Sequence, residues 1–153
     1  MHQCRVYFKI SFPYDKEKFL SYIHQKVAPK DIRPEDISVL YMDEIEKELQ
    51  ELGATYEKKT HHFQVNKSEE YQVYISDMVR DVILPFVGKE KYLLHLQKKY
   101  DLSYTLEIVP TIDLASEEVR PCLSLDPDII AFLFLTNTQF DLDYYILEKN
   151  EEN

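Results

Sequence analysis

Glycine is nearly absent from this sequence, and its scarcity argues against one large class of binding site. The whole chain has two glycines, Gly53 and Gly88. Loops that cradle a nucleotide phosphate bring successive backbone amides close together, which needs several glycines within a few residues. We therefore expect no nucleotide cofactor, and no other cofactor is indicated.

The short motifs of common hydrolases and zinc sites are also missing. The chain contains no Gly-x-Ser-x-Gly, no His-Glu-x-x-His and no Cys-x-x-Cys. His61 and His62 are adjacent, and adjacent side chains of a strand leave by opposite faces, which is the wrong geometry for one metal ion. His95 lies in an apolar helical pattern with no partner that would make it a catalytic base. The sequence thus identifies no catalytic residue and no metal ligand.

Cysteine is scarce, and long apolar runs are absent. Cys4 and Cys122 are the two cysteines, and we expect two small buried side chains rather than a disulfide. No run approaches the length of a membrane span, and the first residues lack the apolar core of a signal peptide. We expect a cytoplasmic protein.

Positive charge is outnumbered by negative charge. The 28 acidic and 18 basic residues give a formal net charge of −10, which repels phosphate backbones and anionic lipids, so neither nucleic acid nor membrane is an expected partner. The segment from Asp31 to Glu51 contains eight acidic residues and only two basic ones, Arg33 and Lys47. A solvated helix face is the favoured interpretation, and a surface for a basic protein is the alternative. Its candidate residues are Asp43, Glu44, Glu46 and Glu48.

Length and composition predict one globular domain over residues 1–153, with a disordered tail at 148–153. Hydrophobic residues make up 44% of the chain, and their periodicity predicts alternating helices and strands. We expect an α+β fold with a mainly antiparallel sheet of four or five strands and helices largely on one face. The expected strands are 4–12, 54–65, a further extended piece at 70–76, a hairpin of 102–113 with 120–125, and 140–146. The expected helices are 15–29, 34–52, 76–87, 89–100 and 126–137.

The terminal strand carries the most distinctive polar pattern. Phe140, Leu142, Tyr144 and Ile146 alternate with a second set that shares the wetter face, namely Asp141, Asp143 and Tyr145. Two carboxylates can bind a divalent cation, yet no acidic loop nearby supplies the further oxygen ligands, so a metal site is disfavoured. These three residues are candidates for an interaction surface, or for the polar pocket of a sensor or enzyme together with a nearby histidine.

Two further features suggest association. The segment Ile129–Leu135 is apolar at every position, whereas a helix on a sheet needs one apolar stripe, so we expect self-association through its outer side. The chain has 12 tyrosines, which suit either interface positions or half-buried sheet positions.

Several segments of the C-terminal half resemble a known family. They are "SDMVRDVILPFV", "YTLEIVPTID" and "PCLSLDPDIIAFLFLTNTQFDLDYYIL", in which Leu123 and Ser124 precede a helix and a strand from Phe140 to Tyr145. Over residues 71–147, about half of the chain, the sequence resembles the mostly bacterial proteins of the domain-of-unknown-function 4279 family. The resemblance implies a small α+β domain without an assigned enzyme activity and supplies no catalytic residues. For some such proteins it implies a role as immunity partners of bacterial toxins.

Two functions follow as hypotheses. The favoured one is a non-enzymatic protein-binding module, of immunity or inhibitor type, that engages a basic partner. The alternative is a small-ligand sensor or an enzyme with a polar pocket that uses Asp141 and Asp143. The absence of any catalytic spacing favours the first.

Overall fold

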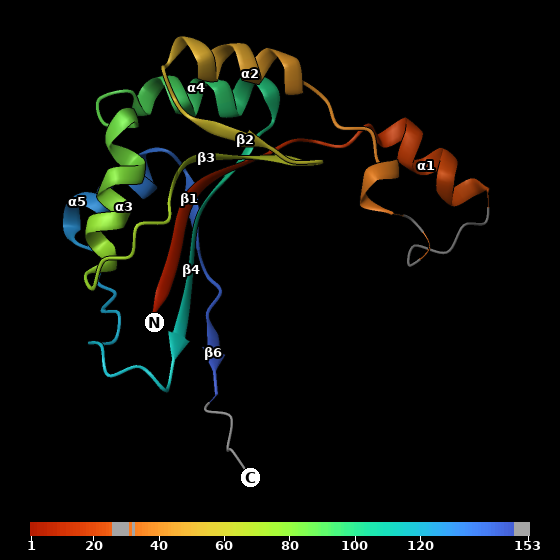
Figure 1. Cartoon of the computed structure of the whole chain (residues 1–153). Coiled ribbons are helices and arrows are strands. Elements are labelled where there is room, and N and C mark those ends of the chain that lie inside the picture. Colours follow the sequence, from red (N-terminus) through yellow and green to blue (C-terminus); the bar gives the residue numbers. More distant parts are fainter. Residues whose placement is uncertain (26–30, 32, 149–153) are drawn as a thin grey trace.

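One six-stranded sheet forms the centre of the protein, and most helices cover one of its faces (Figure 1). The computed structural model describes residues 1–25, 31 and 33–148. Strand order is β2-β3-β1-β4-β5, and β6 also pairs with β4. The strands are β1 (Gln3–Ser11), β2 (Tyr56–Lys58), β3 (His62–Ser68), β4 (Ser103–Asp113), β5 (Thr138–Leu142) and β6 (Tyr145–Leu147).

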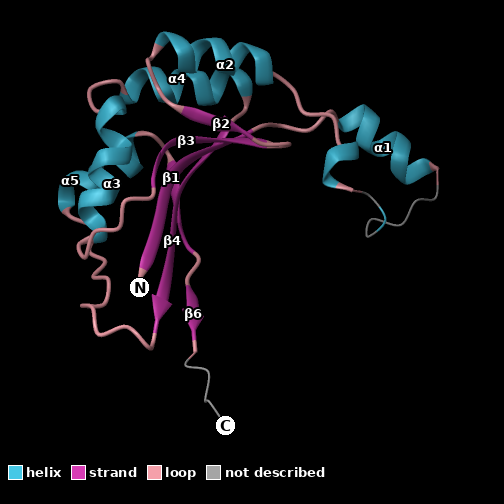
Figure 2. Ribbon diagram, viewed as in Figure 1, coloured by secondary structure: helices cyan, strands magenta, loops and turns pink. Residues whose placement is uncertain are grey.

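The helices divide into a packed group and one that stands apart. Helices α2 to α5 lie on the same side of the curved sheet, whereas α1 lies away from it (Figure 2). Helix α1 has no buried residue, although Asp15 caps it as predicted by accepting a hydrogen bond from the Lys18 N–H. The helices are α1 (Lys16–His24), α2 (Met42–Glu51), α3 (Ile75–Ile83), α4 (Glu90–Tyr100) and α5 (Pro127–Leu135), with short 3-10 turns at Pro34–Asp36 and Leu84–Phe86.

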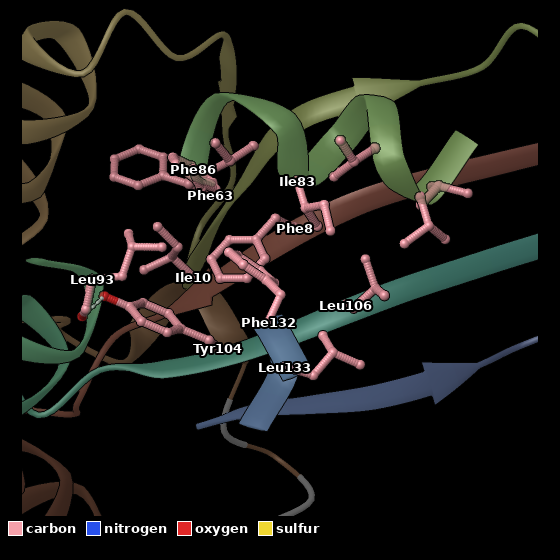
Figure 3. Packing of buried hydrophobic residues seen from close by; sticks show 14 of the residues in the cluster. Phe8, Ile10, Phe63, Ile83, Phe86, Leu93, Tyr104, Leu106, Phe132 and Leu133 are labelled. Carbon is pink, nitrogen blue, oxygen red and sulfur yellow. Dashed lines mark hydrogen bonds between the residues drawn. The ribbon is translucent and has the colours of Figure 1, made fainter. Parts of the chain in front are cut away.

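Phe8 lies at the centre of the hydrophobic core (Figure 3). Its ring centroid lies 5.3 Å from that of Phe86, 5.1 Å from that of Tyr104 and 6.4 Å from that of Phe132. The Tyr104 hydroxyl donates to the Leu93 carbonyl at 2.6 Å, which satisfies the one polar atom of this buried ring. Two α-helices, one 3-10 turn and two strands therefore meet at one aromatic cluster.

The α+β class and the mainly antiparallel sheet are confirmed, and the number of strands differs from the expectation. The sheet has six strands rather than four or five, of which β5 and β6 run parallel to β4. The predicted hairpin of 102–113 with 120–125 is wrong, because β4 has β1 on one side and the C-terminal strands on the other. The segments 70–76 and 120–125 meet only at a single bridge between Tyr74 and Cys122.

The predicted helix at 34–52 is also wrong in its first half. Helix α2 begins only at Met42, after Tyr41 in the left-handed conformation. The preceding residues are held extended by the chain around Pro13, because the Asp15 N–H bonds to the Ser38 carbonyl at 2.8 Å. These tertiary hydrogen bonds outweigh helix propensity. The predicted stop is confirmed, since Gly53 has a φ of 69° just beyond the helix.

The remaining expectations divide between confirmed and corrected. The helices predicted at 89–100 and 126–137 and the strand at 4–12 are present with shifted ends, whereas the strand predicted at 140–146 is divided into β5 and β6. Both cysteines are free, but Cys122 is exposed rather than buried. Among the described helices, none has the length and apolar character that a membrane crossing requires. The tail predicted to be disordered lies, from residue 149 on, outside the described residues.

Two phenylalanines on α5 provide a test of this core. Phe132 is 3% exposed, whereas Phe134, half a turn away, is 84% exposed. We expect Phe132→Ala to lower the free energy of unfolding by about 3–5 kcal/mol through lost burial and a cavity. The matched Phe134→Ala should change it by less than about 0.5 kcal/mol. Urea unfolding at low protein concentration measures both, and equal losses would show that α5 does not pack as described.

Candidate interaction surface

The face of the sheet opposite the helices is polar and open. The register of β1 with β4 places Tyr7 beside Glu107 and Lys9 beside Thr105. Glu107 is nonetheless only 6% exposed. Its carboxylate accepts a hydrogen bond from the Lys9 ammonium at 3.3 Å. The next strand places Asp141 on its other side.

Burial and a neighbouring carboxyl perturb this cluster. Burial raises the pKa of Glu107, the hydrogen bond with Asp141 raises it further, and Lys9 partly offsets both. Burial also raises the pKa of Tyr7, and the charge of Glu107 adds to that effect. The surroundings of Glu107 thus make its ionised form less favourable than that of an exposed glutamate.

The three C-terminal candidates share this open face, as the alternation of the strand predicts. Asp141 pairs with Glu107 and Tyr145 with Thr111, both on the open face of β4. The Tyr145 hydroxyl donates to Asp143 at 3.2 Å. In the described part of the chain, neither Asp141 nor Asp143 has a lysine or arginine at ion-pair distance. Their role in interaction stays a prediction.

The acidic residues of α2 lie at the opposite edge of the sheet, beside β2. Glu46 accepts hydrogen bonds from the Tyr56 hydroxyl at 2.9 Å and from Lys58 at 3.2 Å. Glu48 accepts one from the Tyr92 hydroxyl of α4. These two carboxylates hold α2 to its neighbours, and only Asp43 and Glu44 of the four candidates are fully exposed. The two predicted acidic groups therefore do not form one surface.

Two hollows flank the C-terminal edge of the sheet, and the sequence identified neither. One, of about 550 Å³, is lined by residues of β1 such as Arg5 and by Tyr71 and Tyr145. The other, of about 240 Å³, is apolar and lies among Ile112, Leu123 and neighbouring side chains. Neither is lined by Asp141 or Asp143.

The structure does not bring His62 beside the two aspartates. His62, on the open face, belongs to β3, and β1 and β4 separate it from β5. Three strand spacings amount to roughly 14 Å. Within the described residues, no group of three or more histidine, cysteine, aspartate or glutamate side chains is arranged to hold a metal ion.

The edge strand itself is the most exposed ordered part of the sheet. Every residue from 140 to 147 is exposed. Its large apolar members on the helix side are about half exposed because the helical layer does not extend over them. They are Phe140, Leu142, Tyr144 and Ile146. A contiguous apolar strip beside two carboxylates that form no ion pair in the described chain is typical of a protein interface.

Comparisons of the chain with protein-family models, with curated proteins and with solved structures found no match.

The raised pKa of Glu107 predicts a specific pH dependence. Folding raises the pKa of this carboxyl group. The stability that such a group contributes is fully present below its ordinary pKa of about 4.3, and it is lost as the pH rises through the raised value. Glu107→Gln keeps a neutral group at this position. We therefore expect the stability of this variant relative to wild type to improve as the pH rises from about 4, and to level off above the raised pKa of Glu107.

A second glutamate serves as the control for this pH dependence. Hydrogen bonding from Lys67 lowers the pKa of Glu57, which is exposed. Relative to wild type, Glu57→Gln should therefore lose a little stability as the pH rises toward the ordinary pKa of about 4.3, and the difference should stay constant above it; the change is small because solvent screens the pair. Urea unfolding from about pH 3 to about pH 7 measures both differences. A flat difference for Glu107→Gln would contradict the account of the open face.

Proposed function

We propose that this protein is a non-enzymatic protein-binding module of the cytoplasm that engages a basic partner through its C-terminal edge strand. The observation that carries the proposal is the exposed edge segment from 140 to 147, formed by β5, β6 and the two residues between them, with an apolar side and an acidic side. Folded domains seldom leave such a strip uncovered without a partner. Asp141 and Asp143 supply the charge that attracts a basic surface and raises the association rate.

The edge strand supports this role better than the acidic helix does. Glu46 and Glu48 are engaged within the chain, so only part of the negative charge of α2 is available to a partner. Asp141 and Asp143 have no such ion pairs among the described residues. A role of immunity or inhibitor type, as the family resemblance implies, fits a module with one acidic docking strand.

The alternative of a ligand sensor or enzyme has less support. Such a site needs Asp141 and Asp143 to line an enclosed space with a general base nearby. The two hollows beside the edge are lined by other residues, and His62 lies three strands away.

Charge reversal at the two acidic sites tests the proposal. Asp141→Lys with Asp143→Lys should slow association with the partner severalfold at low salt, and the difference should shrink above physiological ionic strength as the Debye length falls below about 8 Å. The matched control is Asp43→Lys with Glu44→Lys on α2, which should have a smaller effect. The partner is first recovered from a lysate of the source organism, and stopped-flow mixing then gives the rates. An acidic partner, or a rate that responds only to the α2 variant, would contradict the proposal.

We also propose that copies of the chain associate weakly through the outer side of α5. Ile129, Phe132 and Leu133 are buried in the core, while Ile130 and Phe134 remain exposed. The described parts of the chain thus leave the outer side of this apolar helix open to a second molecule.

Light scattering tests the association. At high micromolar concentration we expect a mean mass above that of the monomer, and Phe134→Ser should return it to the monomer value. Leu84→Ser, a comparably exposed apolar residue beyond α3, is the matched control and should leave the mass unchanged. A monomer mass for the wild-type protein would contradict the proposed association through α5.

A further inference from the structure

The outer side of the C-terminal edge strand is unpaired. The Asp143 N–H bonds to the Ile108 carbonyl of β4 at 3.0 Å. Because the main-chain groups of successive strand residues point to opposite sides, those of Phe140 and Leu142 point away from β4. Among the described strands, none pairs with β5 on that side. The strand therefore presents free backbone donors and acceptors to a partner.

The two faces of this edge differ in chemistry. On the helix side, Leu142 and Tyr144 border the apolar hollow of about 240 Å³. On the open side, Asp141 and Asp143 project as carboxylates. Side chains of neighbouring strands meet on the same face of a sheet. A strand added here would thus have its apolar side chains beside Leu142 and Tyr144 and its basic side chains beside the aspartates.

We infer that the partner contributes an extended segment in which basic and apolar residues alternate, and that this segment adds to the sheet beside β5 and β6. The inference rests on the proposed protein-binding function and specifies its mode. Main-chain hydrogen bonds supply affinity in such strand addition, and alternate side chains supply specificity. Basic and apolar residues must alternate along the partner segment because acidic and apolar side chains alternate along this edge.

A second copy of the chain does not suit the same edge. Antiparallel self-pairing centred on Leu142 would place Asp141 of each copy opposite Asp143 of the other. Like charges directly opposite each other destabilise a pair of strands. The two aspartates therefore act against self-pairing and in favour of a basic strand.

The other edge of the sheet is less suited to an added strand. β2 is only three residues long, and Lys58 and Lys59 at its end pair with Glu46 and Glu57. So short an edge offers few main-chain groups to a partner. Strand addition is therefore expected at one edge only.

Synthetic peptides test the inference without an identified partner. The probe is an acetylated, fluorescently labelled octapeptide that alternates lysine with valine or isoleucine. Two further versions of the peptide carry N-methyl groups on alternate residues, so that each lacks the backbone N–H donors along one of its two edges. A last version has the same composition, but all its lysines precede the apolar residues. Fluorescence anisotropy gives the affinities. We expect one N-methylated version to bind about as well as the parent and the other to bind at least about tenfold more weakly, because only one edge of an added strand meets β5.

Protein variants and hydrogen exchange complete the test. Asp141→Lys with Asp143→Lys should weaken the parent peptide at least about tenfold, and Asp43→Lys with Glu44→Lys should not. The amide protons of Phe140 and Leu142 should become protected from exchange when the tolerated N-methylated peptide binds. Circular dichroism confirms that each variant is folded.

The outcomes separate the mode of binding from the function. Equal binding by both N-methylated versions and by the lysine-first peptide, or unprotected amides at 140 and 142, would overturn strand addition. If Asp141 and Asp143 still controlled the rate of association with the natural partner, the proposed protein-binding function would stand without strand addition. If neither peptide binding nor partner association changed in the variant Asp141→Lys with Asp143→Lys, both proposals would be contradicted.

Discussion

The antiparallel pairing of β1 with β4 fixes the placement of every other element. The two strands pair along the whole of β1, with Phe8 opposite Leu106 and Tyr7 opposite Glu107. Because strand side chains alternate, this register sends Phe8 toward the helices and Glu107 toward the open face. A slip by one residue would expose the aromatic centre of the core and bury the charges.

The single helical layer determines where the protein is open. Helices α3, α4 and α5 pack on the side of Phe8, and α5 connects β4 to β5 as a crossover that makes these strands parallel. The crossover brings the C-terminal strand to the outer edge, where the helices no longer cover its apolar side chains. The candidate surface is therefore a consequence of the topology as much as of the residues that compose it.

The density of acidic residues along the sequence does not show which carboxylates are free of partners in the folded protein. The densest acidic stretch surrounds α2, yet Glu46 and Glu48 use their carboxylates to bind Tyr56 and Tyr92. The shorter acidic pattern at the C-terminus leaves its carboxylates without an ion pair to a lysine or arginine of the described chain. Counting charges along the sequence therefore overestimates how much of the negative charge of α2 is free of partners within the chain.

The sequence by itself determined the local features whose cause is local. Alternation identified β1 and the two faces of the terminal strand, and Asp126 with Pro127 marked the start of α5. It also placed Asp141, Asp143 and Tyr145 together, because a period of two needs no knowledge of neighbours. Only the tertiary structure decided that residues 37–41 are not helical, that 120–125 forms no strand, and that Glu107 is buried beside Asp141. Each of these depends on main-chain or side-chain partners distant in sequence, and their hydrogen bonds and burial outweigh the small propensities that a local pattern can express.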